Sequence, residues 1–329
     1  MLSTVPPRTT TKDLRPTPAP GGRLTIYSAT ERRFCEPLLR GFCKDHPDVE
    51  FDFVFGISTD LHRRHLRDFE SGGATASLLW SSAMDLQMTL VLDGHAQPHG
   101  LHLALPREAA YRDLAVATTC EPLVTLSRDP TAPAGTPGEI AALILRNPDR
   151  WRGRIAVLDI ERNGLGFLAM LQWSFGEPEF EDFLEALKWA APRMAANAPA
   201  LIGALTEGAD LAPHVLGLYA SEAVTADPRL HVASSAAPPL AVSRIAFIPR
   251  RAANPQAASL FLGYMLCPSG QAALAEGGLI PITSRANVRA IALDDAFARF
   301  IDPETRRRLL ARWRAAVGRP DVNAGGSSP

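Results

Sequence analysis

Short apolar strands alternate with amphipathic helices over the first third of the chain. In residues 23–28 (RLTIYS) and 50–55 (EFDFVF), apolar side chains recur at every second position, which predicts strands with one buried face. Between them, Phe34, Leu38 and Phe42 recur at helical spacing. The pattern continues in the order strand 23–28, helix 30–44, strand 50–55, helix 58–70, strand 77–80 and helix 81–92. This alternation indicates a parallel sheet covered by helices.

Two long β-rich segments, 114–126 and 240–248, carry polar residues in their middles and enclose the central part of the chain. Between them, the pattern predicts a buried strand at 154–160 followed by a helix, and a strand at 215–219. Because one long segment leads into the central part and the other leads out, we expect a second lobe inserted into a discontinuous first lobe. A cleft between two lobes is a common place for a ligand.

The predicted fold class is therefore α/β, with two lobes that are each a wound mixed sheet with flanking helices, joined by two hinge strands. The predicted boundaries are a disordered leader at 1–22, lobe 1 at 23–117 plus 243–317, lobe 2 at 118–242, and a disordered tail at 318–329.

Composition excludes several classes of function. The chain has 329 residues, of which 46% are hydrophobic and 21% charged, and its formal net charge is −1. This balance is typical of a soluble globular protein and lacks the basic field of a nucleic-acid-binding protein. No apolar run approaches the roughly 20 residues that cross a bilayer. The first 22 residues contain five prolines and no apolar core, so they do not read as a signal peptide.

The usual motifs of catalysis and cofactor binding do not occur. There is no G-x-S-x-G, H-E-x-x-H, Walker A or G-x-G-x-x-G pattern. Cys35, Cys43, Cys120 and Cys267 form neither a C-x-x-C pair nor a zinc-type spacing, and their disulfide status stays open. We therefore predict that the protein is not an enzyme and has no cofactor.

Polar residues gather in the turns where predicted strands lead into helices, the positions where wound sheets bind ligands. A helix N-terminus offers free N–H donors and a positive dipole end, glycine allows close approach, and Arg162 or Arg244 could balance an anionic charge. Helix capping and ordinary turn formation are the alternative roles of these residues. The candidates in these turns are Ser28, Thr30, Ser81, Ser82, Asp85, Arg162, Asn163, Gly164, Leu165 and Gly166.

A metal site is the alternative interpretation of the same region. Asp85, Glu121, Tyr219 and Glu222 could supply the hard oxygen ligands that suit a ferric ion. His62 and His65 lie three residues apart on one predicted helix, but their segment otherwise reads as a solvated helix face.

The order of motifs resembles the type 2 periplasmic solute-binding proteins of ABC transporters, in the branch of ferric-iron, phosphoglycerate regulatory and hexose-phosphate binding proteins. The most specific matching stretches are WSSAMDLQMTLVLDG and DIERNGLGF, and the resemblance extends from about Arg23 to Ile282. It implies a two-lobed fold, a periplasmic location and delivery of a ligand to an ABC permease. It also implies ligand contacts from Ser28, Thr30, Ser81, Ser82, Thr118, Thr119 and the Asn163–Gly166 turn.

One departure from the ferric-binding pattern affects the choice of ligand. Members that bind iron carry two adjacent tyrosines where this chain has Tyr219 followed by Ala220. The incomplete pair favours a small anionic, phosphorylated ligand, held by hinge closure with Tyr219 among its contacts. Iron, with Tyr219 and Glu121 as ligands, stays the alternative, and so does a sensor that regulates a histidine kinase. The expected partners are an ABC permease or a sensor kinase, and the expected state is a monomer.

Overall fold

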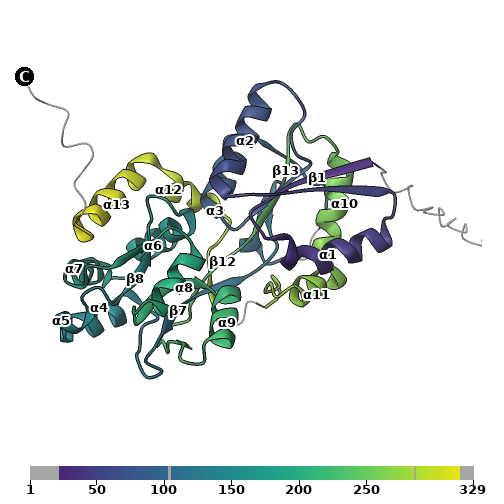
Figure 1. The fold of residues 1–329 in the computed structure, drawn as a ribbon. Coiled ribbons are helices and arrows are strands. Elements are labelled where there is room, and N and C mark those ends of the chain that lie inside the picture. The colour runs from purple at the N-terminus through teal and green to yellow at the C-terminus, as the bar shows by residue number, and fades with distance from the viewer. Residues whose placement is uncertain (1–21, 103–104, 285–286, 319–329) are drawn as a thin grey trace, which may run out of the picture.

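A computed structural model describes residues 22–102, 105–284 and 287–318. The first lobe is built on a seven-stranded mixed sheet (Figure 1). Its strand order is β2-β1-β3-β13-β6-β5, with β4 beside β13. The strands are β1 (Gly22–Ser28), β2 (Val49–Phe55), β3 (Leu78–Ser81), β4 (Ala96–Gln97), β5 (Ala110–Tyr111), β6 (Ala115–Ala117) and β13 (Ile245–Pro249). Parallel pairing of β1 with β2 and β3 confirms the sheet predicted from the first ninety residues.

Helices cover this sheet with the apolar stripes that the sequence shows. In α1 (Arg32–Asp45), Phe34, Leu38 and Phe42 are buried, whereas the charged positions face outward. The other helices of this lobe are α2 (Ser58–Glu70), α3 (Met84–Leu92), α10 (Pro255–Leu266) and α11 (Pro268–Glu276).

The second lobe contains a five-stranded sheet in the order β10-β7-β12-β14, with β11 also paired to β7. Its strands are β7 (Glu121–Ser127), β10 (Leu211–Leu216), β11 (His231–Val232), β12 (Leu240–Val242) and β14 (Arg289–Ala290). A parallel pair, β8 (Ala156–Leu158) and β9 (Arg193–Ala195), adjoins β10 through a bridge between Ile155 and Leu211. The helices are α4 (Pro137–Arg146), α5 (Pro148–Trp151), α6 (Gly164–Gly176), α7 (Phe180–Ala190), α8 (Ala198–Thr206) and α9 (Gly217–Ala226).

Each long β-rich segment contributes one strand to each sheet. The chain leaves the first sheet after β6 and enters the second as β7, and it leaves the second after β12 and returns as β13. The two crossings, at residues 118–120 and 243–244, lie side by side because the Thr118 N–H donates to the Arg244 carbonyl at 2.9 Å. The two-lobed α/β fold is therefore confirmed, while the exact lobe boundaries stay a prediction.

The last helix packs differently from the predicted division of the chain. Two short 3₁₀ helices are η1 (Arg107–Ala109) and η2 (Asp295–Phe297). After η2 come the helices α12 (Ala298–Ile301) and α13 (Pro303–Ala316). Leu309 and Trp313 on α13 belong to the hydrophobic cluster of the second lobe, together with Phe183 and Leu187 on α7. Figure 1 shows α13 in yellow beside α6 and α7. The assignment of all of 243–317 to lobe 1 does not describe this helix.

Two further predictions concern the ends of elements. The strand predicted at 215–219 ends at Leu216, and Tyr219 lies in the first turn of α9. The predicted leader lies outside the described residues except for Gly22, and the tail except for Gly318.

All four cysteines are free. Within 22–102, 105–284 and 287–318, no helix is both long and apolar enough to cross a membrane.

Candidate functional site

A cavity of about 650 Å³ lies between the two lobes, within the range of roughly 300–1,000 Å³ common for small-molecule sites. The first lobe contributes Ala29, residues 55–60, Arg63, Ser82, Ala83 and Leu86 to its lining. The second lobe contributes residues 162–165, residues 196–199, Leu216 and Tyr219, and Arg244 lines it from a crossing segment. We call this cavity the cleft.

Five helix N-termini meet at the cleft, two from the first lobe and three from the second. The first turns or the preceding residues of α2 and α3 line it from the first lobe, and those of α6, α8 and α9 line it from the second. The N–H groups of a first turn have no partner within their helix, and the dipole of the helix places partial positive charge there. The cleft thus presents amide donors from two sides, an arrangement suited to an anion.

The caps of these helices decide how many donors remain for a ligand. On α6, the Asn163 side chain accepts from the Gly166 N–H at 2.8 Å, and Asn197 on α8 accepts from the Ala200 N–H at 2.9 Å. The N-terminal residues of α2 and α3 have no side-chain cap. Among the described residues, the N–H groups of Gly164 and Leu165 have no hydrogen-bond partner. These two donors therefore stay available at the edge of the cleft.

Glycine is required where α6 begins. A Cβ atom on Gly166 would lie 2.7 Å from Cβ of Leu158, closer than side chains pack. Gly166 is buried, packs against Leu158 of β8 and is not part of the lining of the cleft. At Gly164, a Cβ would meet Oδ1 of Asp85 at 3.5 Å, an ordinary contact. Close packing of the α6 N-terminus, rather than contact with a ligand, explains Gly166.

Arg244 lines the cleft, but its charge is already neutralised. Its Nε lies 2.8 Å from Oε1 of Glu121, Nη2 donates to Glu121 Oε2 at 3.1 Å, and Nη1 donates to the Thr30 hydroxyl at 2.8 Å. The exposed fractions of the Arg244 and Glu121 side chains are 3% and 0%. A buried pair of this kind joins the crossing segments to the start of α1 and leaves little charge for a ligand.

Several predicted ligand contacts belong to this buried network instead. Thr119 donates its hydroxyl to Glu121 at 2.9 Å and accepts the Arg244 N–H, also at 2.9 Å. Thr118 accepts from Trp80 Nε1 at 2.8 Å. Ser28 is fully buried and accepts from the Thr30 N–H at 3.0 Å. In this arrangement of the lobes, these residues hold the crossing segments together and do not line the cleft.

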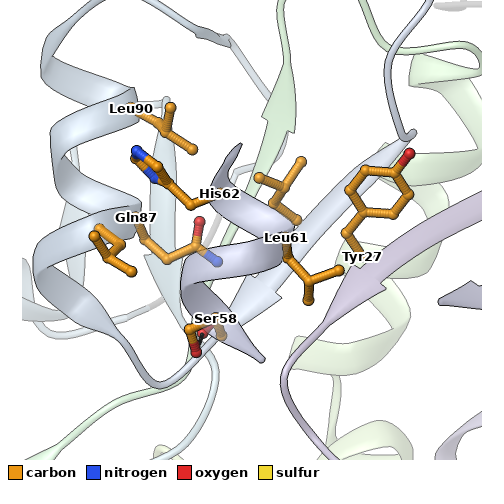
Figure 2. A pocket seen from close by; sticks show the side chains of 9 residues that line it. Tyr27, Ser58, Leu61, His62, Gln87 and Leu90 are labelled. Carbon is orange, nitrogen blue, oxygen red and sulfur yellow. Dashed lines mark hydrogen bonds between the residues drawn. The ribbon is translucent and has the colours of Figure 1, made fainter. Parts of the chain in front are cut away.

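Ser81 lies beside the cleft in a separate small cavity between α2, α3 and β3. Its hydroxyl is 3.1 Å from that of Ser58, which is labelled in Figure 2. The Ser81 hydroxyl also accepts the Ala83 N–H at 3.1 Å. The cavity measures about 20 Å³, room for roughly one water molecule. Figure 2 shows Leu61 and His62 beside it, so its walls leave no room for an organic ligand.

Asp85 is buried next to the cleft rather than exposed in it. Its side chain faces Gly164 across the contact between α3 and α6, and its Oδ1 has no hydrogen-bond partner among the described residues. Burial raises the pKa of its carboxyl group. Of the predicted contacts, the structure thus brings to the cleft Ser82, Arg162, Asn163, Gly164, Leu165 and Tyr219.

Sequence reasoning missed two contributors to the cleft. One is the start of α2, where Ser58 begins a helix after an apolar strand as the other candidates do. The segment 196–199 begins α8, and Asn197 followed by Pro199 at the second helical position is a recognisable start signal. The local sequence does not mark either segment as a ligand contact, because the residues that face it across the cleft are far away in the chain.

Two of the acidic candidates for a metal site are engaged in ion pairs. Among the described residues, no group of three or more His, Cys, Asp or Glu side chains could hold a metal ion. Glu121 is engaged with Arg244, and Glu222 pairs with Arg33 at 2.7 Å. Burial raises the pKa of the Tyr219 phenol, which opposes formation of the phenolate that ferric iron prefers.

Comparison with known proteins identifies the family. A model of the bacterial extracellular solute-binding proteins matches residues 24–280. The chain belongs to this family. It is therefore an extracytoplasmic solute-binding protein of the kind that serves ABC transporters, and not an enzyme, as the sequence predicted. A search of curated protein sequences gave no significant match.

Solved structures show the same fold. The substrate-binding protein of an ABC transporter from Agrobacterium tumefaciens is 26% identical, with a TM-score of 0.81 over 91% of this chain and 95% of that one. Iron-bound HitA from Pseudomonas aeruginosa is 17% identical, with a TM-score of 0.67 over 89% and 99%. AfuA from Actinobacillus pleuropneumoniae, with fructose-6-phosphate bound, is 15% identical, with a TM-score of 0.67 over 90% and 98%.

Proposed function

We propose that this solute-binding protein works in the periplasm and that its cleft binds a small organic anion carrying a phosphate group. The observation that supports this most directly is the meeting of helix N-termini from both lobes around one cavity. Their N–H donors fit the several acceptor oxygens of a phosphate group. A ligand held by donors from both lobes also favours the closed state over the open one.

Arg162 provides the charge that balances the ligand. Of the three arginines in the cleft, Arg244 is paired with Glu121, and Arg63 lies 3.1 Å from Asp60. Arg162 is exposed, and among the described residues no carboxylate lies within ion-pair distance of it. Its guanidinium can donate two parallel hydrogen bonds to a phosphate at the N-terminus of α6.

The crossing segments at residues 118–120 and 243–244 act as the hinge. They are bonded to each other through Thr118 and Arg244, so they turn as one unit when the lobes close. Closure brings the donors of α2 and α3 toward those of α6 and α8. An ABC permease then recognises the closed form, and the protein acts as a monomer.

The alternatives are an iron binder and a sensor for a histidine kinase. Iron is disfavoured because Glu121 is paired with Arg244 and because Ala220, not a second tyrosine, follows Tyr219. AfuA, similar in fold, has a sugar phosphate bound, which agrees with a phosphorylated ligand. Transport and sensing share the same ligand site, and uptake of labelled ligand by cells with and without the gene separates them.

The test is isothermal titration of the purified chain with glycerol phosphate, inorganic phosphate, citrate and ferric citrate. Replacing Arg162 by methionine (Arg162→Met) is expected to weaken phosphate-ester binding at least tenfold, about 1.4 kcal/mol, because a charge-assisted hydrogen bond is lost. Arg146→Met is the matched control, since Arg146 is exposed at the far end of α4 and away from the cleft. Binding of ferric iron alone, or equal affinity in both variants, contradicts the proposal.

A further inference from the structure

Two large apolar side chains are exposed inside the cleft. Phe55 is 56% exposed and Ile57 is 70% exposed, and both line the cavity. They flank Gly56, between the end of β2 and the start of α2. Among the described residues, the other large exposed apolar side chains are outside the lining of the cleft: Leu145, Phe175, Trp189 and Val232.

The backbone of this turn is held in place, so the exposure of the two side chains is not a result of a loose loop. The Gly56 N–H donates to the Ser28 carbonyl at 3.2 Å, which continues the pairing of β2 with β1. The Ile57 carbonyl accepts from the N–H groups of Asp60 and Leu61, both at 3.0 Å. A Cβ atom on Gly56 would lie 3.2 Å from the Leu61 side chain, so the turn packs closely against α2.

Further apolar residues complete this side of the cleft. Leu86 on α3 lines it from the same lobe, and Leu165, Pro199 and Leu216 line it from the other lobe. A cleft for a bare ion requires only polar donors, and a cavity of about 650 Å³ exceeds the space that an ion occupies. The cleft therefore combines anion donors with an apolar wall, which suits a ligand with two chemically different ends.

We propose that Phe55 and Ile57 form a specificity wall for the organic part of the ligand, and that the preferred ligand is a phosphate monoester of an apolar or aromatic alcohol. This inference rests on the proposed function, because the phosphate group is placed at the helix N-termini and Arg162. It excludes inorganic phosphate as the physiological ligand and ranks hydroxyl-rich sugar phosphates below esters with an apolar group. Hydroxyl groups against this wall would lose hydrogen bonds to water without gaining partners.

The expected size of the preference follows from area. Covering roughly 55 Å² of apolar surface on either side chain corresponds to about a tenfold change in affinity at 25 cal/mol per Å². Each side chain is expected to contribute separately, since Phe55 ends β2 and Ile57 precedes the first turn of α2.

The experiment is titration of the full chain with phenyl phosphate, glycerol phosphate and inorganic phosphate. Because two separate tenfold contributions multiply, phenyl phosphate is expected to bind about a hundredfold more tightly than glycerol phosphate. In Phe55→Ser and in Ile57→Ser this ratio is expected to fall about tenfold. Phe175→Ser is the matched control, because Phe175 is also 56% exposed but does not line the cleft, and Val232→Ser serves likewise for Ile57.

The outcomes separate this inference from the proposed function. Equal affinity of the wild-type protein for phenyl and glycerol phosphate, together with loss of both in Arg162→Met, overturns the apolar wall and leaves the anion site standing. A preference that is the same in Phe55→Ser, Ile57→Ser and the two controls also overturns the wall. No binding of any of the three compounds overturns both proposals. Thermal melting of each variant checks that it is folded.

Discussion

Removing the Arg244 side chain tests whether this residue serves the hinge or the ligand. Arg244 lines the cleft, yet its guanidinium contacts Glu121 and Thr30 and is almost fully buried. In Arg244→Met, the Glu121 carboxylate stays buried with only the Thr119 hydroxyl as a neutral donor. An uncompensated buried charge is far more destabilising than the loss of an exposed ion pair.

The magnitude follows from this burial. Breaking a buried ion pair by removing one partner costs about 3–5 kcal/mol, whereas an exposed pair contributes about 0–1 kcal/mol. Since 1 kcal/mol shifts the melting temperature of a large domain by roughly 2–4 °C, Arg244→Met is expected to melt about 10 °C below the wild type. Arg63→Met is the matched control, because the Arg63–Asp60 pair is 66% and 60% exposed.

The assay is urea unfolding at pH 7 without ligand, followed by circular dichroism. The double variant Arg244→Met/Glu121→Leu removes both charges and is expected to recover most of the lost free energy of unfolding. A loss below 1 kcal/mol in Arg244→Met, or no recovery in the double variant, would refute the assignment of Arg244 to the hinge. In that case Arg244 would return to the ligand site, and its loss would be seen in titration instead.

Two further predictions concern the stability of the second lobe. Gly166→Ala forces a contact at 2.7 Å with Leu158 and is expected to lower the free energy of unfolding by about 1–3 kcal/mol. Gly203 on α8 has open space around it, so Gly203→Ala is expected to raise the free energy of unfolding by about 0.5–1 kcal/mol. Urea unfolding of both variants measures the difference, and equal effects contradict the packing argument. Burial lowers the pKa of His214 to about 3, below its value of about 6.5 in the unfolded chain. Between these two pH values the unfolded state binds a proton on His214 that the folded state does not bind. The free energy of unfolding is therefore expected to fall as the pH drops from about 6.5 toward 3. Unfolding of His214→Asn from pH 7 to pH 4 is expected to show a smaller decline; an unchanged decline assigns the effect to other groups.

The sequence by itself determined the elements and their order. Alternating apolar positions identified the first parallel strands, and helical spacing identified α1, because these patterns reflect which side of each element is buried. The turn at Asn163–Gly166 was recognisable as a helix start, and in the structure Asn163 caps α6. The resemblance in motif order supported the family, which the match over residues 24–280 confirms.

Only the tertiary structure decided which polar turns face the cleft. Thr30 and Thr119 look as suitable for a ligand as Ser82 does, but the pairing of the crossing segments turns them toward Arg244 and Glu121. Side chains in such segments change face with a one-residue shift in register, and nothing local fixes that register. Their role therefore could not be predicted from their own sequence.

The same reason applies to the parts of the site and the fold that the sequence missed. The exposure of Ile57 depends on where α2 begins in space, and α13 buries Trp313 against α7 although the sequence alone assigned it to the first lobe. An amphipathic helix shows that it has an apolar face, but not which surface covers that face. Contacts between residues far apart in sequence made that choice, and they exist only once both lobes have formed.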